Sequence, residues 1–222
     1  NIMNKVYLAA DFGGGSGRVI AGWLEDGQLK MEEVHRFGNR QVRLGDHVYW
    51  DFPALFEDMK AGLKKAAAKG YKVESIGVDT WGVDFGLIDR DGQLIGNPVC
   101  YRDARTAGMV EEMFKTLNPT EHYATTGIQV MEINTLPQLL SIKGTAQLES
   151  AQHLLFMPDL FSYFLTGEIS NEYCIATTSE LMDAKRRNWS WETIKILDLP
   201  ERIFGNIVMP GSVRGTLTPE VA

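Results

Sequence analysis

The first forty residues alternate between apolar and polar positions with the period of a β-strand. Residues 5–10, 18–24 and 29–37 each carry such a run, and an Asp26-Gly27 pair separates the last two. This alternation predicts half-buried strands, and an Asp-Gly pair between two of them is a hairpin signal. We therefore expect the chain to open with an antiparallel meander, in which residues 12–17 form the tight turn between the first two strands.

A helical period follows the polar stretch 40–46. Asp51 stands where a helix N-cap is expected, with Pro53 in the first turn. Apolar residues then recur at spacings of three and four, up to Gly70. The positions that share this predicted helical face are Leu55, Phe56, Met59, Leu63 and Ala67.

Two further strands and several helices complete the predicted pattern. Residues 74–79 predict a fourth strand with a buried centre, and residues 84–88 a fifth, which a turn at 89–92 folds back onto 93–95. A helix is expected from Thr106 to 118. The remainder reads as mostly helical, then as a connecting loop over 209–222.

Breaks in this helical remainder are expected at Gly144, Pro158 and Gly167. The order of elements, βββαβ followed by helices, predicts an α/β fold with a mixed sheet flanked by helices.

Composition and charge exclude several classes of protein to which the chain could belong. The 222 residues are 44% hydrophobic with a formal net charge of −7, which excludes a disordered chain, and no Lys/Arg block indicates a nucleic-acid partner. No apolar run approaches the roughly 18 residues of a membrane helix, and no signal peptide is visible. We expect a cytoplasmic protein without a membrane partner. Cys100 and Cys174 are too few for a disulfide framework and are expected in the core.

Residues 11–18, with the sequence D-F-G-G-G-S-G-R, form the first candidate site. Glycines let backbone N–H groups approach an anion, and the Ser16 hydroxyl can donate a further hydrogen bond. Arg18 supplies a charge that matches phosphate, and Asp11 is placed to orient a magnesium-bound water. A flexible hairpin loop is the alternative. A strand follows rather than a helix, and no Gly-Lys-Ser/Thr is present, which excludes a dinucleotide fingerprint and a Walker loop.

Two later segments carry groups that suit a sugar. Residues 79–85, D-T-W-G-V-D-F, gather polar side chains between two predicted strands, and Trp81 beside Gly82 offers a flat wall next to open backbone. The alternative places Trp81 in the core of a simple turn. In residues 101–106, Arg102 can reach sugar hydroxyls, whereas Asp103 is equally suited to cap the following helix. The four histidines show no metal-ligand spacing.

Read in order, these segments resemble the N-terminal half of the FGGY carbohydrate kinases, a branch of the actin-like ATPase superfamily. The resemblance covers nearly the whole chain. Besides the first candidate site, it includes residues 75–79, 102–106, 126–136, 157–159 and 165–167. Within the family, residues 79–85 look most like the rhamnulokinase branch. Xylulokinases usually carry Gln-Met-His-Gly there and glycerol kinases Gln-Arg-Glu, and this chain has neither.

The resemblance implies a ribonuclease-H-like fold and ATP-dependent phosphorylation of L-rhamnulose to L-rhamnulose 1-phosphate, with ATP and Mg²⁺ as cofactors. By this comparison Asp11 lies near magnesium. The residues implied to face the ATP phosphates are Gly14, Gly15, Ser16, Gly17 and Arg18. Those implied to face the sugar are Gly82, Trp81, Asp84 and Arg102.

One departure from the family pattern bears on activity. The family's catalytic base is an aspartate in a His-Asp-Thr or similar motif that opens the second half, and no His-Asp-Thr occurs in this sequence. We expect the base and the adenine pocket beyond Ala222, in a second, nucleotide-binding half that is the partner of this chain. Residues 1–222 are then the sugar-binding N-terminal domain, inactive by itself.

Three alternatives stay open at this point. The chain could belong to a kinase of another sugar, such as fuculose, xylulose or glycerol. It could also be a non-catalytic sugar- or nucleotide-binding module, because a fold does not fix a function. Residues 81–85 and 102–106 speak against the third, an actin-like chaperone or structural ATPase.

Overall fold

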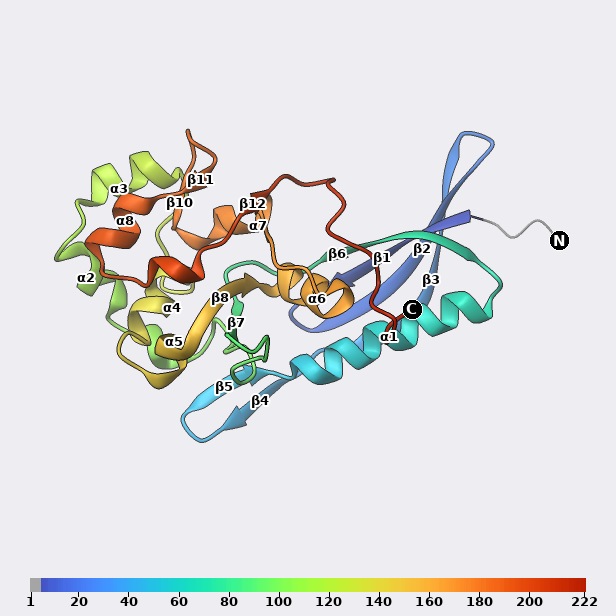
Figure 1. The fold of residues 1–222 in the computed structure, drawn as a ribbon, viewed down its shortest axis with the longest axis horizontal. Helices are drawn as coiled ribbons and strands as arrows, with labels where there is room; N and C mark the ends of the chain where they lie inside the picture. The colour runs from blue at the N-terminus through green and yellow to red at the C-terminus, as the bar shows by residue number, and fades with distance from the viewer. Residues whose placement is uncertain (1–4) are drawn as a thin grey trace. The chain divides into compact units, whose positions relative to one another are not determined.

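The computed structural model describes residues 5–222 and divides into two compact units (Figure 1). Unit 1 holds residues up to 42 together with 50–81, and unit 2 holds residues 43–49 and 82–220. Among the described residues, no helix has both the length and the apolar character that crossing a membrane requires.

A four-stranded mixed sheet forms the centre of unit 1. Its strands are β1 (Lys5–Phe12), β2 (Ser16–Glu25), β3 (Gln28–Gly38) and β6 (Lys72–Asp79), in the order β3-β2-β1-β6. β1 runs antiparallel to β2 and parallel to β6, which confirms the predicted meander and mixed sheet. Asp26 and Gly27, at φ 49° and 75°, give the β2–β3 turn the two positive φ angles of a type I′ hairpin.

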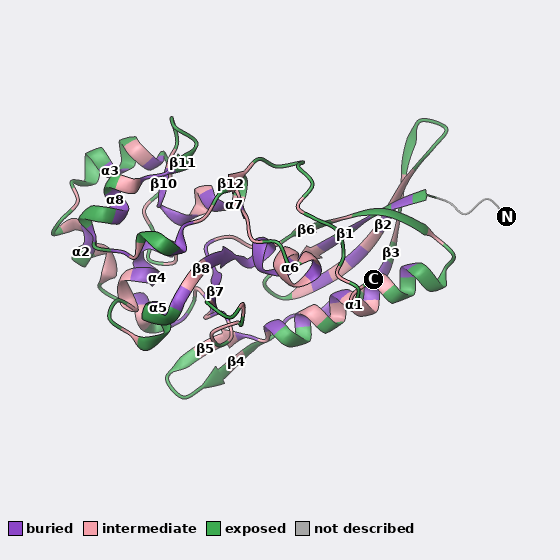
Figure 2. Cartoon of the chain, viewed as in Figure 1, coloured by how far each residue is buried: buried purple, intermediate pink, exposed green. Residues whose placement is uncertain are grey.

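Helix α1 (Phe52–Ala68) begins where the sequence predicts it. The Asp51 side chain accepts a hydrogen bond from the Ala54 N–H at 3.3 Å, and Gly70 follows the helix with a left-handed φ of 79°. Figure 2 shows buried, intermediate and exposed positions alternating along α1. The buried face lies further round the helix than predicted, because Ala67 is exposed and Phe56 and Leu63 are only partly buried. The buried residues are Phe52, Leu55, Met59, Gly62 and Ala66.

Gly62 allows α1 to pack closely against β2. A Cβ atom there would lie 2.4 Å from Val19 Cγ2 and 2.7 Å from Val19 Cβ. Overpacking of this kind is destabilising, so we expect Gly62→Ala to lower the free energy of unfolding by about 2 kcal/mol. Urea unfolding measures the loss.

The exposed Ala67 on the same helix provides the control: Ala67→Ser should change stability by less than about 0.5 kcal/mol. In a Val19→Gly background the effect of Gly62→Ala should fall by half or more, because the opposing methyl groups and the Cβ atom of Val19 are gone. An unchanged effect in that background would show that Val19 is not what excludes a side chain.

Strand β6 does not have the buried centre that was predicted. It is the edge of the described sheet, hydrogen-bonded to β1, and no described strand lies on its other side. Val73 is accordingly 37% exposed and Ile76 is only partly buried. The apolar sequence alone does not distinguish an edge strand from a central one.

Unit 2 is built round an antiparallel pair, β7 (Phe85–Asp89) and β8 (Ala151–Phe156). β8 lies in the part of the chain that was predicted as mostly helical, and its apolar run is too short for periodicity to distinguish a strand from a helix. Pro158 does not break a helix but lies in the first turn of α6 (Met157–Thr166), where its missing N–H is tolerated. A Cβ at Gly86 would lie 2.8 Å from Leu160, so α6 packs closely on β7.

Short elements surround this pair. The helices are α2 (Met109–Phe114), α3 (Pro119–Thr126), α4 (Thr135–Ser141), α5 (Ala146–Ser150), α7 (Tyr173–Ala176) and α8 (Trp191–Ile196), with 3-10 turns η1 (Ala104–Thr106), η2 (Thr177–Ser179) and η3 (Glu201–Ile203). The small ladders are β9 (Asn171–Glu172) with β12 (Ile207–Val208), and β10 (Met182–Asp183) with β11 (Asn188–Trp189). A hairpin of β4 (Gln41–Leu44) and β5 (His47–Trp50) occupies the polar stretch for which no strand was predicted.

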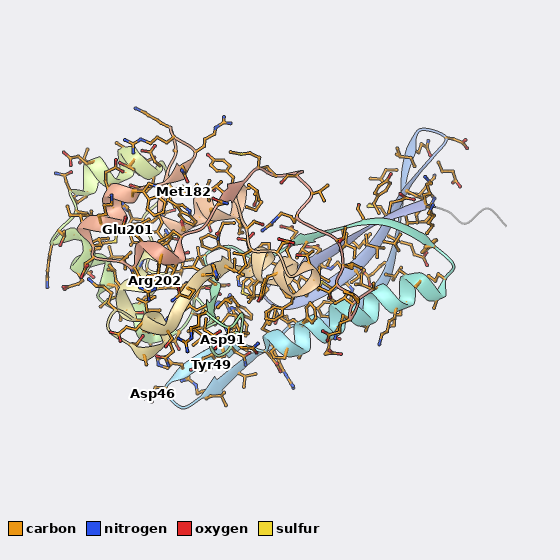
Figure 3. The ribbon with its side chains drawn as sticks, viewed as in Figure 1. Asp46, Tyr49, Asp91, Met182, Glu201 and Arg202 are labelled. Atoms are coloured by element: carbon orange, nitrogen blue, oxygen red, sulfur yellow. The ribbon has the colours of Figure 1, made fainter. Side chains whose placement is uncertain are left out.

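The Arg202 side chain binds backbone carbonyls at the end of α5. Arg202, labelled on η3 in Figure 3, donates hydrogen bonds to the carbonyls of Leu148 and Glu149 at 3.0 and 2.8 Å and to Ala151 at 2.9 Å. The Leu148 carbonyl also accepts from the Ala151 N–H at the end of α5, and Ala151 itself begins β8, so Arg202 ties the end of this helix to the start of the strand. Cys100 is buried as predicted, but Cys174 is exposed, so the prediction of a core position for it was wrong.

Candidate functional site

Hydrogen bonds within the turn between β1 and β2, and from Asn39, fix the conformation of this turn. The Gly13 N–H donates to the Ser16 carbonyl at 2.8 Å. Asn39, which is buried, donates from its side chain to the Gly13 carbonyl at 2.8 Å and from its backbone to the Gly15 carbonyl at 3.1 Å. Sequence reasoning missed Asn39, which follows β3. These bonds favour a rigid turn over the flexible loop considered as the alternative.

The tip of this turn presents open backbone. Gly14 and Gly15 are exposed, and no residue in the described part of the chain accepts a hydrogen bond from either backbone N–H. A Cβ at Gly15 would meet nothing within 4 Å. Unpaired N–H groups on a fixed turn form a concavity that suits an anion such as a phosphate.

Charged and polar side chains stand beside the tip. Asp11 and Arg18 are direct neighbours across β1 and β2, and Arg18 Nη1 lies 2.8 Å from Asp11 Oδ2. Arg18 Nη2 also donates to Ser16 Oγ at 3.1 Å. The structure thus brings together the acidic, hydroxyl and basic groups predicted for phosphate and magnesium.

The donor set allows magnesium only in an indirect role. Residues 5–222 contain no cluster of three or more His, Cys, Asp or Glu side chains that could hold a metal. Magnesium commonly keeps several waters and is held by one or two carboxylates plus substrate phosphates. Asp11, as a single carboxylate beside a phosphate cradle, fits that pattern.

Gly17 differs from its neighbours in the turn. It is buried, and a Cβ there would lie 2.3 Å from Phe37 Cε2 and 3.3 Å from Phe12 Cδ1. These two rings pack together with centroids 5.5 Å apart. Packing alone therefore explains a glycine at 17, and its contact with phosphate stays a prediction.

Asp84 begins the second cluster, in unit 2. It is fully buried, and its carboxylate accepts hydrogen bonds from Gln138 Nε2 at 3.0 Å and from the Tyr101 N–H at 3.2 Å. Gln138 in turn accepts from Arg105 Nη2 at 2.7 Å. Burial lowers the pKa of the Arg105 guanidinium, while the Asp103 and Asp84 carboxylates oppose that shift. Sequence reasoning did not find Gln138, which fixes Asp84 in place.

Arg102 and Asp103 have separate roles. Asp103 caps η1 by accepting from the Arg105 N–H at 3.1 Å, and also accepts from the Val48 N–H at 2.8 Å, with His47 Nδ1 3.0 Å away. Burial alone would raise the pKa of Asp103, but these hydrogen bonds hold it below its usual value. Asp103 therefore caps the short turn η1 and not the long helix that was predicted, because α2 begins only after Gly108. Arg102 is exposed, with its guanidinium 5.4 Å from the Tyr101 ring centre.

Trp81 and Gly82 fall on either side of the division between the two units. Trp81 is half-buried in unit 1, and its ring lies 4.2 Å from that of the buried Trp50. In unit 2, a Cβ at Gly82 would lie 3.0 Å from Thr178 Cγ2 and Oγ1. Thr178 would oppose a larger residue at position 82 whether or not a sugar binds there.

Comparison with known proteins identifies the family. Residues 6–222 match the N-terminal domain of the FGGY family of carbohydrate kinases. The chain belongs to this family. It is 44% identical over 99% of its length to a rhamnulokinase of Bacteroides thetaiotaomicron, and 40% identical over 99% to one of Oceanobacillus iheyensis. It covers 46% and 47% of those proteins, so it spans about half the length of these relatives.

Solved FGGY structures share the fold. The ligand-bound xylulose kinase of Lactobacillus acidophilus superposes with a TM-score of 0.86 at 17% identity, over 98% of this chain and 44% of that one. The glycerol kinase of Plasmodium falciparum with ADP gives a TM-score of 0.79 at 18% identity, over 99% and 46%. The predicted α/β fold of the actin-like ATPase kind is confirmed.

Outside the two clusters, Asp159 in the first turn of α6 is a buried acid whose pKa is markedly raised. Burial raises its pKa to about 6, although Arg214, 2.8 Å away, acts to lower it. A raised pKa in the folded state gives stability that is complete below the unfolded value near 3.8 and is lost as pH rises through 6. Between pH 4 and 8, Asp159→Asn should therefore gain up to about 3 kcal/mol relative to the unmodified chain.

Urea unfolding at several pH values measures this difference. Asp91→Asn is the control, because Asp91 is exposed in the turn after β7 (Figure 3) and should leave the pH dependence unchanged. A constant stability difference between Asp159→Asn and the unmodified chain over this range would contradict the prediction.

Proposed function

We propose that this chain is the N-terminal, sugar-binding half of an ATP-dependent rhamnulokinase, which transfers the terminal phosphoryl group of ATP to the 1-hydroxyl of L-rhamnulose. The observation that carries the kinase assignment is the rigid glycine turn, whose free N–H groups lie beside Arg18. The choice of sugar rests on the rhamnulokinases that are 44% and 40% identical to the chain.

In this proposal the residues of the β1–β2 turn bind and orient the phosphates. The Gly14 and Gly15 N–H groups donate to phosphate oxygens, the Ser16 hydroxyl adds a donor, and Arg18 supplies positive charge. Asp11 orients Arg18 and a magnesium-bound water. Magnesium, when bound, neutralises charge that develops on the phosphate oxygens.

The second cluster binds the sugar. Arg102, which is exposed, donates to hydroxyl groups. A sugar contact of Trp81, which belongs to unit 1, stays a prediction of the family resemblance. The Gly82 backbone contacts the sugar. The buried Asp84 fixes the segment that contains Gly82. These roles orient a sugar hydroxyl and leave removal of its proton to a group beyond residues 1–222.

We assign the catalytic base and the adenine pocket to a second half of the same polypeptide, which is the partner of this chain. Coverage of only 46% of the Bacteroides rhamnulokinase supports this assignment, as does the lack of a His-Asp-Thr motif. The reaction is placed in the cytoplasm, where ATP and free sugars meet.

An ADP-release assay tests the proposal. The 222-residue chain is compared with the polypeptide extended by its second half, using ATP, Mg²⁺ and L-rhamnulose, with fuculose, xylulose and glycerol as control sugars. We expect turnover by the extended polypeptide alone, and with rhamnulose. Preference for another sugar would overturn the assignment of L-rhamnulose as the substrate. Activity of the short chain would place the catalytic base within residues 1–222. Sugar binding without any turnover would favour the binding-module alternative.

A further inference from the structure

Val83 has a backbone conformation that its side chain disfavours. Its φ is +65°, in the left-handed region, and a β-branched residue there is a genuine outlier. Such a conformation costs on the order of 1–3 kcal/mol and persists only where the surroundings enforce it, often at functional sites. Val83 lies between Gly82, which is assigned to the sugar, and Asp84, which is buried and fixes this segment.

Two threonine hydroxyls hold both backbone polar groups of Val83. The Val83 N–H donates to Thr178 Oγ1 at 3.0 Å, and Thr135 Oγ1 donates to the Val83 carbonyl at 2.6 Å. Thr178 also donates to the Ile175 carbonyl at 2.8 Å, so its hydroxyl proton is committed and its lone pair faces Val83. Thr135 is fully buried at the start of α4. We call Thr135 and Thr178 the Val83 clamp.

A buried network joins the two arms of the clamp. Asn134, next to Thr135, donates from Nδ2 to Glu180 Oε1 at 2.6 Å. Glu180 follows Thr178 by two residues, and its other oxygen lies 2.7 Å from His122 Nε2. These three side chains are all buried. The distance between the segments that carry the two hydroxyls is therefore fixed.

The clamp controls the segment on both sides of Val83. The Asp84 N–H donates to the Gly82 carbonyl at 2.9 Å, which closes a tight turn over Val83. If Val83 relaxed to a negative φ, the Gly82 peptide and the Asp84 backbone would both rotate. We propose that Thr135 and Thr178 are positioning residues, which hold the strained Val83 peptides and thereby place Gly82 against the sugar and Asp84 in its buried site.

Paired substitutions in the extended polypeptide test this proposal, which rests on the proposed function. Thr178→Val and Thr135→Val keep the shape but remove the hydroxyl. Each should raise the KM for L-rhamnulose at least tenfold and change the KM for ATP less than twofold. Thr178→Ser and Thr135→Ser keep the hydroxyl and should stay within threefold of the unmodified enzyme. Because Thr135 is fully buried, Thr178→Val alone decides the outcome if Thr135→Val does not fold.

Thr125→Val is the matched control. The Thr125 hydroxyl donates to the Glu121 carbonyl within α3 at 3.0 Å, so its loss removes a hydrogen bond that does not reach Val83. This variant should leave both KM values unchanged. Equal effects of Thr178→Val on both substrates would indicate general loss of structure and would overturn a positioning role.

Hydrogen exchange of the Val83 N–H gives a readout that does not depend on the substrate. Thr178→Val should speed this exchange at least tenfold, whereas Thr178→Ser should not. If the extended polypeptide uses a sugar other than rhamnulose, the proposed substrate is wrong. The effects of the variants on the KM for sugar and the KM for ATP are then compared with the sugar that the polypeptide does use. Unchanged Val83 exchange in Thr178→Val would overturn the clamp whatever the substrate.

Discussion

Replacing Arg18 with alanine is expected to lower kcat/KM for ATP by about 1000-fold in the extended polypeptide. Arg18 brings a fixed positive charge to the turn where the phosphates are proposed to bind, and groups of this kind contribute about 100- to 1000-fold or more. The side chain is only 25% exposed, so part of its solvation has already been given up and its interactions are strong. Steady-state kinetics with varied ATP measures the loss, and calorimetry should find the affinity for sugar within twofold.

Arg36 provides the matched control for Arg18. It is the direct neighbour of Arg18 across β2 and β3, but it is an exposed residue whose guanidinium pairs with Glu33. Exposed ion pairs contribute little, so Arg36→Ala should change ATP kinetics less than twofold. Arg18→Lys keeps the charge without the planar fork and should be intermediate.

Arg18→Ala also leaves Asp11 unpaired, and a free carboxylate would repel phosphate. The double variant Asp11→Asn/Arg18→Ala removes this repulsion together with the proposed contact of Asp11 with a magnesium-bound water. If the double variant recovers most of the activity, the loss came from Asp11, and Arg18 serves only to neutralise it. Normal ATP kinetics in Arg18→Ala would remove the phosphate assignment of the turn.

Sequence predicted those parts of the fold that local chemistry decides. The Asp26-Gly27 turn, the Asp51 cap and the three opening strands depend on residues a few positions apart, and all three are confirmed. Strand β8 and the edge position of β6 depend on which distant segments lie beside them. A short apolar run is compatible with either outcome.

The same limit applies to the candidate site. Asp11, Ser16 and Arg18 were predicted because they share one turn. Their supporting residues come from far along the chain: 26 residues separate Gly13 from Asn39, 54 separate Asp84 from Gln138, and 95 separate Val83 from Thr178. No local pattern indicates such partners.

Glycines show a second limit. Gly15 has open space around it, whereas a side chain at Gly17 or Gly82 would meet Phe37 or Thr178. In the sequence these glycines look alike. Only the packing around each one shows whether it leaves room for a ligand or for a neighbouring side chain.

Glu180→Ala is expected to cause the largest loss of stability, about 4 kcal/mol. Glu180 is fully buried and accepts hydrogen bonds from Asn134 Nδ2 at 2.6 Å and the Met131 N–H at 3.2 Å, with His122 Nε2 2.7 Å from its other oxygen. Alanine leaves these groups buried without partners, and removing one member of a buried pair typically costs about 3–5 kcal/mol. The urea midpoint should fall with an unchanged slope.

Glu132→Ala shows whether stability is lost because the buried network is broken or because any carboxylate is removed. Glu132 is exposed and adjoins Met131, so its removal should change stability by less than about 0.5 kcal/mol. Glu180→Gln keeps the volume and one acceptor and should lose less than Glu180→Ala. Since Asn134 and Glu180 are in direct contact, their alanine variants should couple by at least about 1 kcal/mol in a double-mutant cycle. Additive losses would mean that the two side chains stabilise unit 2 separately, and the link between Thr135 and Thr178 would then have to come from their own contacts with Val83.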